Sequence, residues 1–303
     1  MDIKSGYAAI IGLPNSGKSS LLNAILGQKI SITTNKPQTT RKSIAGILSE
    51  ESYQIIFLDT PGILKPEYLL QERMMDYVEK SIKDADVILF LGDLENDPQC
   101  EKMLKNEYVA EIIAKTNRRK ILVLNKADKS NDAFIKELIE KFSSEKIFDA
   151  VIPVSSMYKF NIQSIVEAIL EYLPSHPKYY EDDIAANETE RFFVSEIIRE
   201  KIFELYKEEI PYSCEVIIED YKERPGRKDF ISAEINVERN SQKGIIIGKM
   251  GEAIKKLGSK SRESIEEFLQ KEVYLELRVK VAEKWRTNEL SLKSFGYSKG
   301  LDE

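Results

Sequence analysis

The sequence is poor in the residues that build disulfide frameworks, thiolate metal sites and imidazole-based active sites. It contains two cysteines, Cys100 and Cys214, and one histidine, His176. Two cysteines so far apart make neither a CxxC metal site nor a disulfide framework, so we expect two free thiols in a reducing compartment. His176 lies between Pro174 and Pro177 in an expected linker, which argues against histidine-based catalysis and His-rich metal sites.

Long hydrophobic runs are also missing. No window approaches the roughly 18 consecutive apolar residues of a membrane-spanning helix, and the first residues carry no signal-peptide pattern. We therefore expect a cytoplasmic protein. With 42% hydrophobic and 32% charged residues, and only 14 Gly and 10 Pro, the composition excludes a mainly disordered or collagen-like chain. A length of 303 residues, about twice that of a typical domain, predicts two domains.

Positive charge is scarce overall but concentrated locally. The chain has 45 Lys+Arg against 51 Asp+Glu, a net charge of −6, which taken alone argues against a nucleic-acid partner. Residues 239–262 nevertheless carry seven cations and one carboxylate, a local charge of +6 that leaves −12 for the rest of the chain. Because phosphate affinity depends on local cations, this segment is compatible with RNA binding by an acidic protein.

The first half of the chain alternates short apolar runs with helix-compatible stretches. Continuous apolar runs of this length are typical of strands covered on both faces, and their alternation with helices predicts an α/β fold with a doubly wound, mostly parallel sheet. The expected strands are 7–11, 44–48, 55–58, 87–91, 121–124 and 151–154, and the expected helices include 19–26, 101–115, 132–142 and 161–172.

The pattern changes after residue 174. Two prolines and an acidic run predict a linker over 175–188, between a nucleotide-binding domain (1–174) and a second domain (189–303). The second part reads as a helix at 189–206, two strands, a short apolar segment, a glycine turn, a helix at 253–269 and a strand at 273–281. The order α-β-β-α-α-β predicts a small α+β domain.

A phosphate-binding motif follows the first expected strand and precedes a helix. It matches GxxxxGK[ST], in which glycines let the backbone N–H groups surround phosphate oxygens. Lys18 is expected to reach the β- and γ-phosphates and the Ser19 hydroxyl to ligate Mg²⁺. The expected phosphate-binding residues are Gly12, Leu13, Pro14, Asn15, Ser16, Gly17, Lys18 and Ser19.

Three further motifs end later strands in the order that a guanine-nucleotide site requires. Asp59 can hold a Mg²⁺-bound water, and the Gly62 N–H can meet a γ-phosphate. The Asp128 carboxylate can accept hydrogen bonds from both N1–H and the N2 amine of guanine, which favours GTP over ATP because adenine has no such donor pair. The expected residues are Asp59, Thr60, Pro61, Gly62 and Ile63, then Asn125, Lys126 and Asp128, then Ser155, Ser156 and Met157.

These motifs resemble the Era/TrmE-like branch of the TRAFAC-class GTPases. There the Mg²⁺-binding threonine lies in a PxTTR-type segment, which here is Pro37-Gln38-Thr39-Thr40-Arg41. The resemblance implies that Thr40 ligates Mg²⁺, that residues 28–41 form switch I and that switch II begins at Asp59. The expected catalytic group is Lys18, Thr40, Asp59 and Gly62, with a slow intrinsic rate of GTP hydrolysis.

One departure affects the expected mechanism. Ras-like GTPases place a water-orienting glutamine after the DxxG motif, whereas this chain has Ile63, which cannot position water. Catalysis then depends on Mg²⁺ and phosphate electrostatics. Asn15 is the residue that, in relatives, accompanies K⁺ near the phosphates, so the resemblance implies K⁺ as a second cation. The alternative is that Asn15 only shapes the loop.

The second domain contains a GxxG turn, Gly248-Lys249-Met250-Gly251, that follows an apolar run and precedes a helix. In KH domains this turn joins two helices and clamps the backbone of about four nucleotides. Strands ahead of the helices predict the type II arrangement. The expected RNA-binding residues are Lys243, Gly244, Ile247, Gly248, Lys249, Met250, Gly251, Lys255 and Lys256.

Taken over nearly the whole chain, these segments resemble the Era family of bacterial GTPases with a C-terminal KH domain. The resemblance implies binding to the 3′ end of 16S rRNA, assembly of the 30S subunit, GTP-controlled RNA engagement, a monomer and peripheral membrane association. Two alternatives stay open. The first alternative to this reading is an RNA placeholder whose hydrolysis only drives disassembly. The second is a membrane-associated regulatory GTPase whose basic segment contacts lipid headgroups.

Overall fold

The computed structural model describes residues 3–297 and divides them into two units. The first comprises residues 3–66 and 74–187, and the second comprises residues 67–73 and 188–297. None of the helices in this described range has the length and hydropathy of a membrane-spanning segment. Cys100 and Cys214 are both buried free thiols, as expected.

The first unit is built on a six-stranded sheet with the order β2-β3-β1-β4-β5-β6. Only β2 runs antiparallel to its neighbour, so the expected mostly parallel sheet is confirmed. The apolar runs that predicted the strands are almost completely buried, as a sheet with helices on both faces requires. The strands are β1 (Lys4–Ile11), β2 (Ile44–Glu50), β3 (Tyr53–Asp59), β4 (Val87–Asp93), β5 (Arg119–Asn125) and β6 (Ala150–Pro153).

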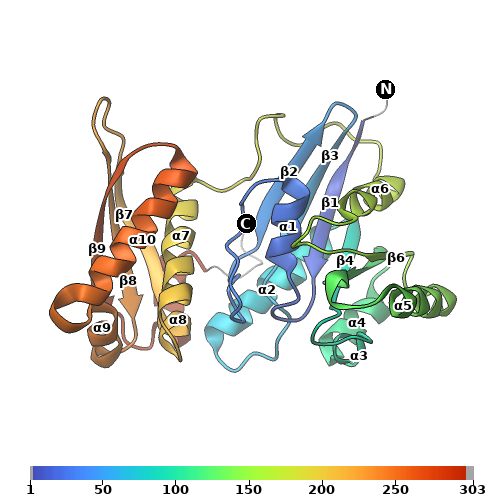
Figure 1. Cartoon of the computed structure of the whole chain (residues 1–303), viewed down its shortest axis with the longest axis horizontal. Helices are drawn as coiled ribbons and strands as arrows, with labels where there is room; N and C mark the ends of the chain where they lie inside the picture. The colour runs from blue at the N-terminus through green and yellow to red at the C-terminus, as the bar shows by residue number, and fades with distance from the viewer. Residues whose placement is uncertain (1–2, 298–303) are drawn as a thin grey trace. The chain divides into compact units, whose positions relative to one another are not determined.

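Helices cover both faces of this sheet (Figure 1). One face packs against α2, α4 and α5 through a core that includes Val78, Phe90 and Phe142. The helices α1 and α6 lie together on the other face, with Leu21 and Ile165 fully buried. The helices are α1 (Lys18–Leu26), α2 (Leu69–Asp84), α3 (Glu101–Leu104), α4 (Glu107–Lys115), α5 (Asp132–Glu145) and α6 (Ile162–Tyr172), with the 3₁₀ turn η1 (Ala127–Lys129).

The stretch expected as one helix over 101–115 is two helices. The Asn106 side chain accepts hydrogen bonds from the backbone N–H groups of Tyr108 (3.1 Å) and Val109 (3.2 Å), which makes it the N-cap of α4. An extended N-cap residue cannot continue a preceding helix, so α3 ends before it. The apolar spacing alone did not reveal this interruption.

The segment expected as a linker is packed against the first unit over most of its length, so the expected boundary at residue 174 was wrong. The buried Gln54 side chain accepts hydrogen bonds from the N–H groups of Tyr179 (2.8 Å) and Tyr180 (3.0 Å) and donates to the carbonyl of Tyr180 (2.9 Å). Residues 185–187 then pair with β2, where Ile47 N–H donates to Ala185 O (2.8 Å). Prolines and charges predicted a loop correctly but carried no information on these partners.

The second unit is a three-stranded sheet with the order β7-β8-β9, in which β7 is antiparallel and β9 parallel to β8. Helices α7, α9 and α10 pack on one face of it (Figure 1). This confirms the expected α+β KH fold with strands ahead of the GxxG turn. The elements are α7 (Glu190–Leu205), α8 (Ile210–Ser213), β7 (Glu215–Lys222), β8 (Asp229–Val237), α9 (Asn240–Ile247), η2 (Lys249–Gly251), α10 (Glu252–Leu269), β9 (Val273–Val281), η3 (Trp285–Thr287) and α11 (Glu289–Ser294).

Candidate nucleotide-binding and RNA-binding sites

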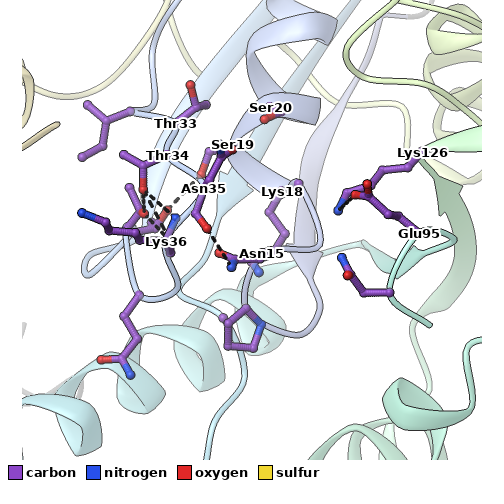
Figure 2. A pocket seen from close by; sticks show the side chains of 18 residues that line it. Asn15, Lys18, Ser19, Ser20, Thr33, Thr34, Asn35, Lys36, Glu95 and Lys126 are labelled. Carbon is purple, nitrogen blue, oxygen red and sulfur yellow. Dashed lines mark hydrogen bonds and ion pairs between the residues drawn. The ribbon is translucent and has the colours of Figure 1, made fainter. Parts of the chain in front are cut away.

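A cavity of about 510 Å³ lies at the carboxyl ends of the parallel strands of the first unit. Figure 2 shows Asn15 and Lys18 of the phosphate-binding loop between residues of the 33–36 segment on one side and Glu95 and Lys126 on the other. The lining residues are Pro14, Asn15, Gly17, Lys18, Ser19, Ser20, Ile32, Thr33, Thr34, Asn35, Lys36, Gln38, Thr39, Thr40, Gly62, Glu95, Asn96 and Lys126.

Lys18 is buried in the phosphate-binding loop, and its ammonium group donates to the carbonyls of Gly12 (3.2 Å) and Leu13 (2.9 Å). Burial lowers the pKa of Lys18 to about 8, against the attraction of Asp59, which raises it. The loop therefore holds a desolvated cation whose charge is only partly compensated. A phosphate group supplies the missing compensation.

Three oxygen donors converge beside this lysine in a manner that suits a hydrated Mg²⁺ ion. The Ser19 hydroxyl donates to Asp59 Oδ2 (2.7 Å) and lies 2.9 Å from the Thr40 hydroxyl. Asp59 Oδ1 is buried without a hydrogen-bond partner, and burial raises the pKa of this carboxyl against the opposing effects of Ser19 and Lys18. An orphaned carboxylate oxygen next to two hydroxyls is a hard-cation donor set. No three His, Cys, Asp or Glu side chains gather elsewhere in the described range as metal ligands.

The segment after β3 is held directly against the phosphate-binding loop. A Cβ atom on Gly62 would lie 2.7 Å from Pro14 Cα, so only glycine permits this approach. The Ile63 N–H donates to Gly12 O (3.0 Å), but the Ile63 side chain is 1% exposed and belongs to the core. Any contact of Ile63 with the nucleotide would therefore come from its backbone, because its side chain is buried in the hydrophobic core. Thr60 is likewise turned inward, donating to Ile10 O (2.7 Å).

The residues expected to bind guanine are brought together by side-chain hydrogen bonds. The Ser155 hydroxyl donates to Asp128 Oδ1 (2.6 Å), which fixes the carboxylate. Asn125 joins two loops: its amide donates to Ser16 O (2.9 Å), and its carbonyl oxygen accepts from the Ser156 hydroxyl (2.8 Å). Met157 belongs to the same loop and is 77% exposed. Of the expected guanine-binding residues, Lys126 lines the 510 Å³ cavity, and Asn125, Asp128, Ser155, Ser156 and Met157 lie beyond its lining.

Two acidic residues at this end of the cavity were not expected from the sequence. The Lys126 ammonium pairs with Asp93 (2.8 Å) and Glu95 (3.0 Å). Burial would lower the pKa of Lys126, but these hydrogen bonds outweigh it and hold the pKa above the usual range. In the sequence, these residues are marked only by their position at the carboxyl end of β4, because ligands of such sheets bind beyond the carboxyl ends of the strands.

Switch I reaches the phosphate-binding loop through Asn15. The Asn15 amide donates to the carbonyl of Asn35 (3.2 Å), and the Asn15 backbone adopts φ 63°. The motifs did not single out the individual residues 32–36 that line the cavity, because switch segments carry few fixed residue types. The proposed K⁺ role of Asn15 stays a prediction.

The GxxG turn of the second unit protrudes between α9 and α10. Gly248 has φ 72°, and a Cβ atom there would lie 2.6 Å from Ala253 Cβ, so the turn requires glycine. Met250 at its tip is 87% exposed, and Lys249 is exposed beside it. Lys255 and Lys256 are exposed on the first turns of α10, whereas Lys243, Ile247 and Gly251 are half-buried and Gly244 is exposed. The expected RNA-binding residues therefore lie in and around one turn.

A groove of about 380 Å³ continues from this region between α10 and β9. Its lining combines apolar and cationic side chains, which suits nucleotide bases next to phosphates. It is lined by Ile254, Lys255, Gly258, Ser259, Arg262, Tyr274, Leu275 and Leu277. Of these, the sequence indicated only Lys255 individually, because the pairing of α10 with β9 is a tertiary contact.

Comparison with known proteins agrees with both sites. Residues 7–126 match a family model described as 50S ribosome-binding GTPase, and residues 209–286 match the KH domain model. GTPase Era of Geotalea daltonii is 45% identical over 293 residues, covering 97% of both chains. The chain belongs to the Era GTPase family. It is therefore a GTPase with a P-loop GTP-binding domain and a KH domain.

Relatives of the same family occur in plants as well as bacteria. The chloroplastic ERA-like GTPase of Arabidopsis thaliana is 47% identical over 296 residues, covering 97% of this chain and 69% of that relative. Among solved structures, Era in complex with MgGDPNP and nucleotides 1506-1542 of 16S ribosomal RNA superposes with a TM-score of 0.87 at 35% identity. That match covers 98% of this chain and 99% of the other, so the Era family fold extends over both units.

Proposed function

We propose that this GTPase binds the 3′ end of 16S rRNA through its KH domain and acts in assembly of the small ribosomal subunit. Its nucleotide state controls RNA engagement. One observation carries the proposal: a guanine-nucleotide pocket and a basic GxxG turn occur in one chain whose whole length matches an Era structure holding MgGDPNP and 16S rRNA nucleotides.

The nucleotide site supports GTP hydrolysis with Mg²⁺. Ser19 and Thr40 are suited to ligate the ion directly, and Asp59 to hold one of its waters. Bound Mg²⁺ neutralises charge that develops on the phosphate oxygens. Lys18 is placed to bind the β- and γ-phosphates, Gly62 to offer its N–H to the γ-phosphate, and Asp128 to select guanine.

The RNA site is tested with the protein as a full chain and the 16S rRNA fragment 1506–1542. We expect Lys249→Glu to weaken binding by at least about tenfold, because it places a repulsive charge at the turn that approaches phosphates. Lys293→Glu on α11 makes the same charge change outside the turn and serves as the control. Equal losses in both variants, or no loss in either, would remove the KH turn from the proposal.

Binding measurements also distinguish the proposal from its two alternatives. We propose a cytoplasmic location and a monomer. A membrane-associated regulatory GTPase would instead bind anionic liposomes through the same basic residues, and the RNA fragment would fail to displace them. An RNA placeholder would bind the fragment with equal affinity in its GTP-analogue and GDP states.

A further inference from the structure

The end of the KH sheet farthest from the GxxG turn carries an aromatic pair. Lys222, Phe230 and Tyr274 lie in register across β7, β8 and β9, on one face of the sheet. The Phe230 and Tyr274 rings stack with centroids 6.0 Å apart and planes inclined by 14°. Tyr274 is 58% exposed, so one of these rings offers its surface to solvent. An exposed aromatic face is a stacking surface for an unpaired base.

Cations that lack carboxylate partners lie in the adjoining β7–β8 hairpin and at residue 271, and one of them contacts this pair. The Arg224 guanidinium lies 4.9 Å from the Phe230 ring centroid. Within residues 3–297, Arg224, Arg227 and Lys271 form no ion pair, and all three are exposed. Their neighbours Lys222 and Lys228 are paired, with Asp220 and with Glu272 (3.3 Å) respectively. Cations without carboxylate partners favour a ligand that carries phosphate groups over a neutral ligand.

Hydrogen bonds fix the base of the hairpin that carries Arg224 and Arg227. The Arg224 N–H donates to Asp229 Oδ1 (2.7 Å), and the Asp229 N–H donates to Glu272 O (3.0 Å). A shallow hollow of about 550 Å³ opens between the hairpin and residues 271–272. The hairpin is therefore anchored to the β9 side of the sheet, so Arg224, Arg227 and Lys271 line a common hollow. The same hollow is lined by Lys228, which pairs with Glu272, and by the carboxylates of Glu223 and Asp229.

Tyr274 connects this region to the groove that starts at the GxxG turn. It lines the groove between α10 and β9 together with Arg262, and on its other side it stacks on Phe230. Figure 1 shows the β7–β8 hairpin and α9 at opposite ends of the sheet. Seven residue steps along β8, from Phe230 to Val237, span about 23 Å. A strand that enters the groove at the GxxG turn therefore reaches Tyr274 about seven nucleotides later at stacked spacing.

We propose that the RNA strand leaves the groove at Tyr274 and continues onto a hairpin platform formed by Phe230, Tyr274, Arg224, Arg227 and Lys271. An unpaired base stacks on the aromatic pair, and adjacent phosphates bind the three cations. The inference rests on the proposed RNA binding and extends its footprint beyond the roughly four nucleotides that a GxxG turn clamps. The exposed aromatic ring in line with the groove favours single-stranded RNA over an acidic peptide.

The test uses two single-stranded RNAs from the 3′ end of the 16S fragment, one of about four nucleotides and one of about twelve, the longer reaching the platform. We expect Arg224→Gln/Arg227→Gln to reduce the slope of log K against log salt by about 1.4 for the long RNA, since each single-strand phosphate contact contributes about 0.7. The short RNA is expected to bind this variant normally. Lys136→Gln/Lys293→Gln removes the same charge elsewhere and is the control.

Stacking is tested at Tyr274 in the same assay. We expect Tyr274→Leu to weaken binding of the long RNA by about tenfold and Tyr274→Phe to leave it nearly unchanged, because only the ring stacks. If wild-type protein binds both RNAs and the arginine variant keeps its salt slope, the platform is wrong while RNA binding stands. If wild-type protein binds neither RNA, the proposed function fails and the platform fails with it.

Discussion

At the scale of single residues, Lys18 carries the most unusual charge state of the nucleotide site. Its ammonium is buried and bonded only to two backbone carbonyls, and burial brings its pKa down to about 8. Bound phosphates would raise the pKa of Lys18 again, because their negative charge favours the ammonium form. We therefore expect nucleotide binding to return a proton to Lys18 in mildly alkaline solution.

We predict that GDP binding to nucleotide-free protein takes up about one proton at pH 9 and almost none at pH 7. At pH 7 the lysine is already charged, whereas at pH 9 it is mostly neutral until phosphate arrives. Calorimetric titration in two buffers of different ionisation enthalpy measures this uptake. Lys18→Arg keeps a permanent charge and is expected to abolish the difference. Equal uptake at both pH values would contradict the prediction.

The sequence revealed the site residues whose chemistry is tied to fixed spacing. Lys18, Ser19, Asp59 and Asp128 fall in motifs because phosphate, Mg²⁺ and guanine each demand a particular group at a particular place. Glu95 was missed because its contact with Lys126 comes from two strand ends that meet only in the folded sheet. The burial of the Ile63 side chain could not be predicted, because a motif position does not state where its side chain points.

At the scale of elements, the segment 175–187 acts as a strap on the first unit. It begins beside the first residues of β1, where Ser5 N–H donates to Pro174 O (3.2 Å), and ends on β2, which follows switch I directly. Between these points the Gln54 amide satisfies three backbone groups of Tyr179 and Tyr180 and also donates to the Ser49 hydroxyl (2.8 Å). One buried side chain therefore fixes the middle of the strap.

We predict that Gln54→Leu releases the strap while the sheet stays folded. The variant removes the hydrogen-bond partner of three part-buried backbone groups, at a cost of about 1 kcal/mol each, so the segment is expected to detach locally. Hydrogen exchange of the peptide covering residues 178–187 measures the release as lost protection. Ser49→Ala removes only one of the Gln54 contacts and is expected to change protection much less. Unchanged protection in Gln54→Leu would show that the strap is held by other contacts.

Strands and helices were predicted well wherever burial imposed a continuous pattern. The runs at 87–91 and 121–124 have every side chain buried, and both became central strands. The packing of the strap on the first unit was not predicted, because it depends on the polar side chain of a single glutamine in β3 and leaves no hydrophobic pattern in the sequence. Helix α4 began at a cap residue that the apolar periodicity does not encode.

At the scale of the whole molecule, charge is divided by position. The chain carries −6 overall, but residues 239–262 hold a local charge of +6, and most of these cations lie exposed on and around the GxxG turn and α10. Apart from the β7–β8 hairpin and Lys271, the acidic remainder discourages nonspecific contact with nucleic acid elsewhere on the surface. RNA binding by this chain is therefore expected to be local and strongly dependent on salt.

If nucleotide state controls RNA engagement, the coupling between nucleotide binding and RNA binding must be reciprocal. We expect a GTP analogue, relative to GDP, to raise affinity for the 16S fragment by about tenfold, within the usual 5- to 150-fold range of coupled sites. The fragment must then raise the preference for the GTP analogue over GDP by the same factor, because both describe one free-energy difference. Fluorescence titrations of each ligand in the presence and absence of the other measure the two factors.

Lys249→Glu is expected to weaken RNA binding and leave nucleotide affinity without RNA unchanged. Two factors close to one would show independent sites, and the chain would then act as an RNA placeholder whose hydrolysis serves release by another route.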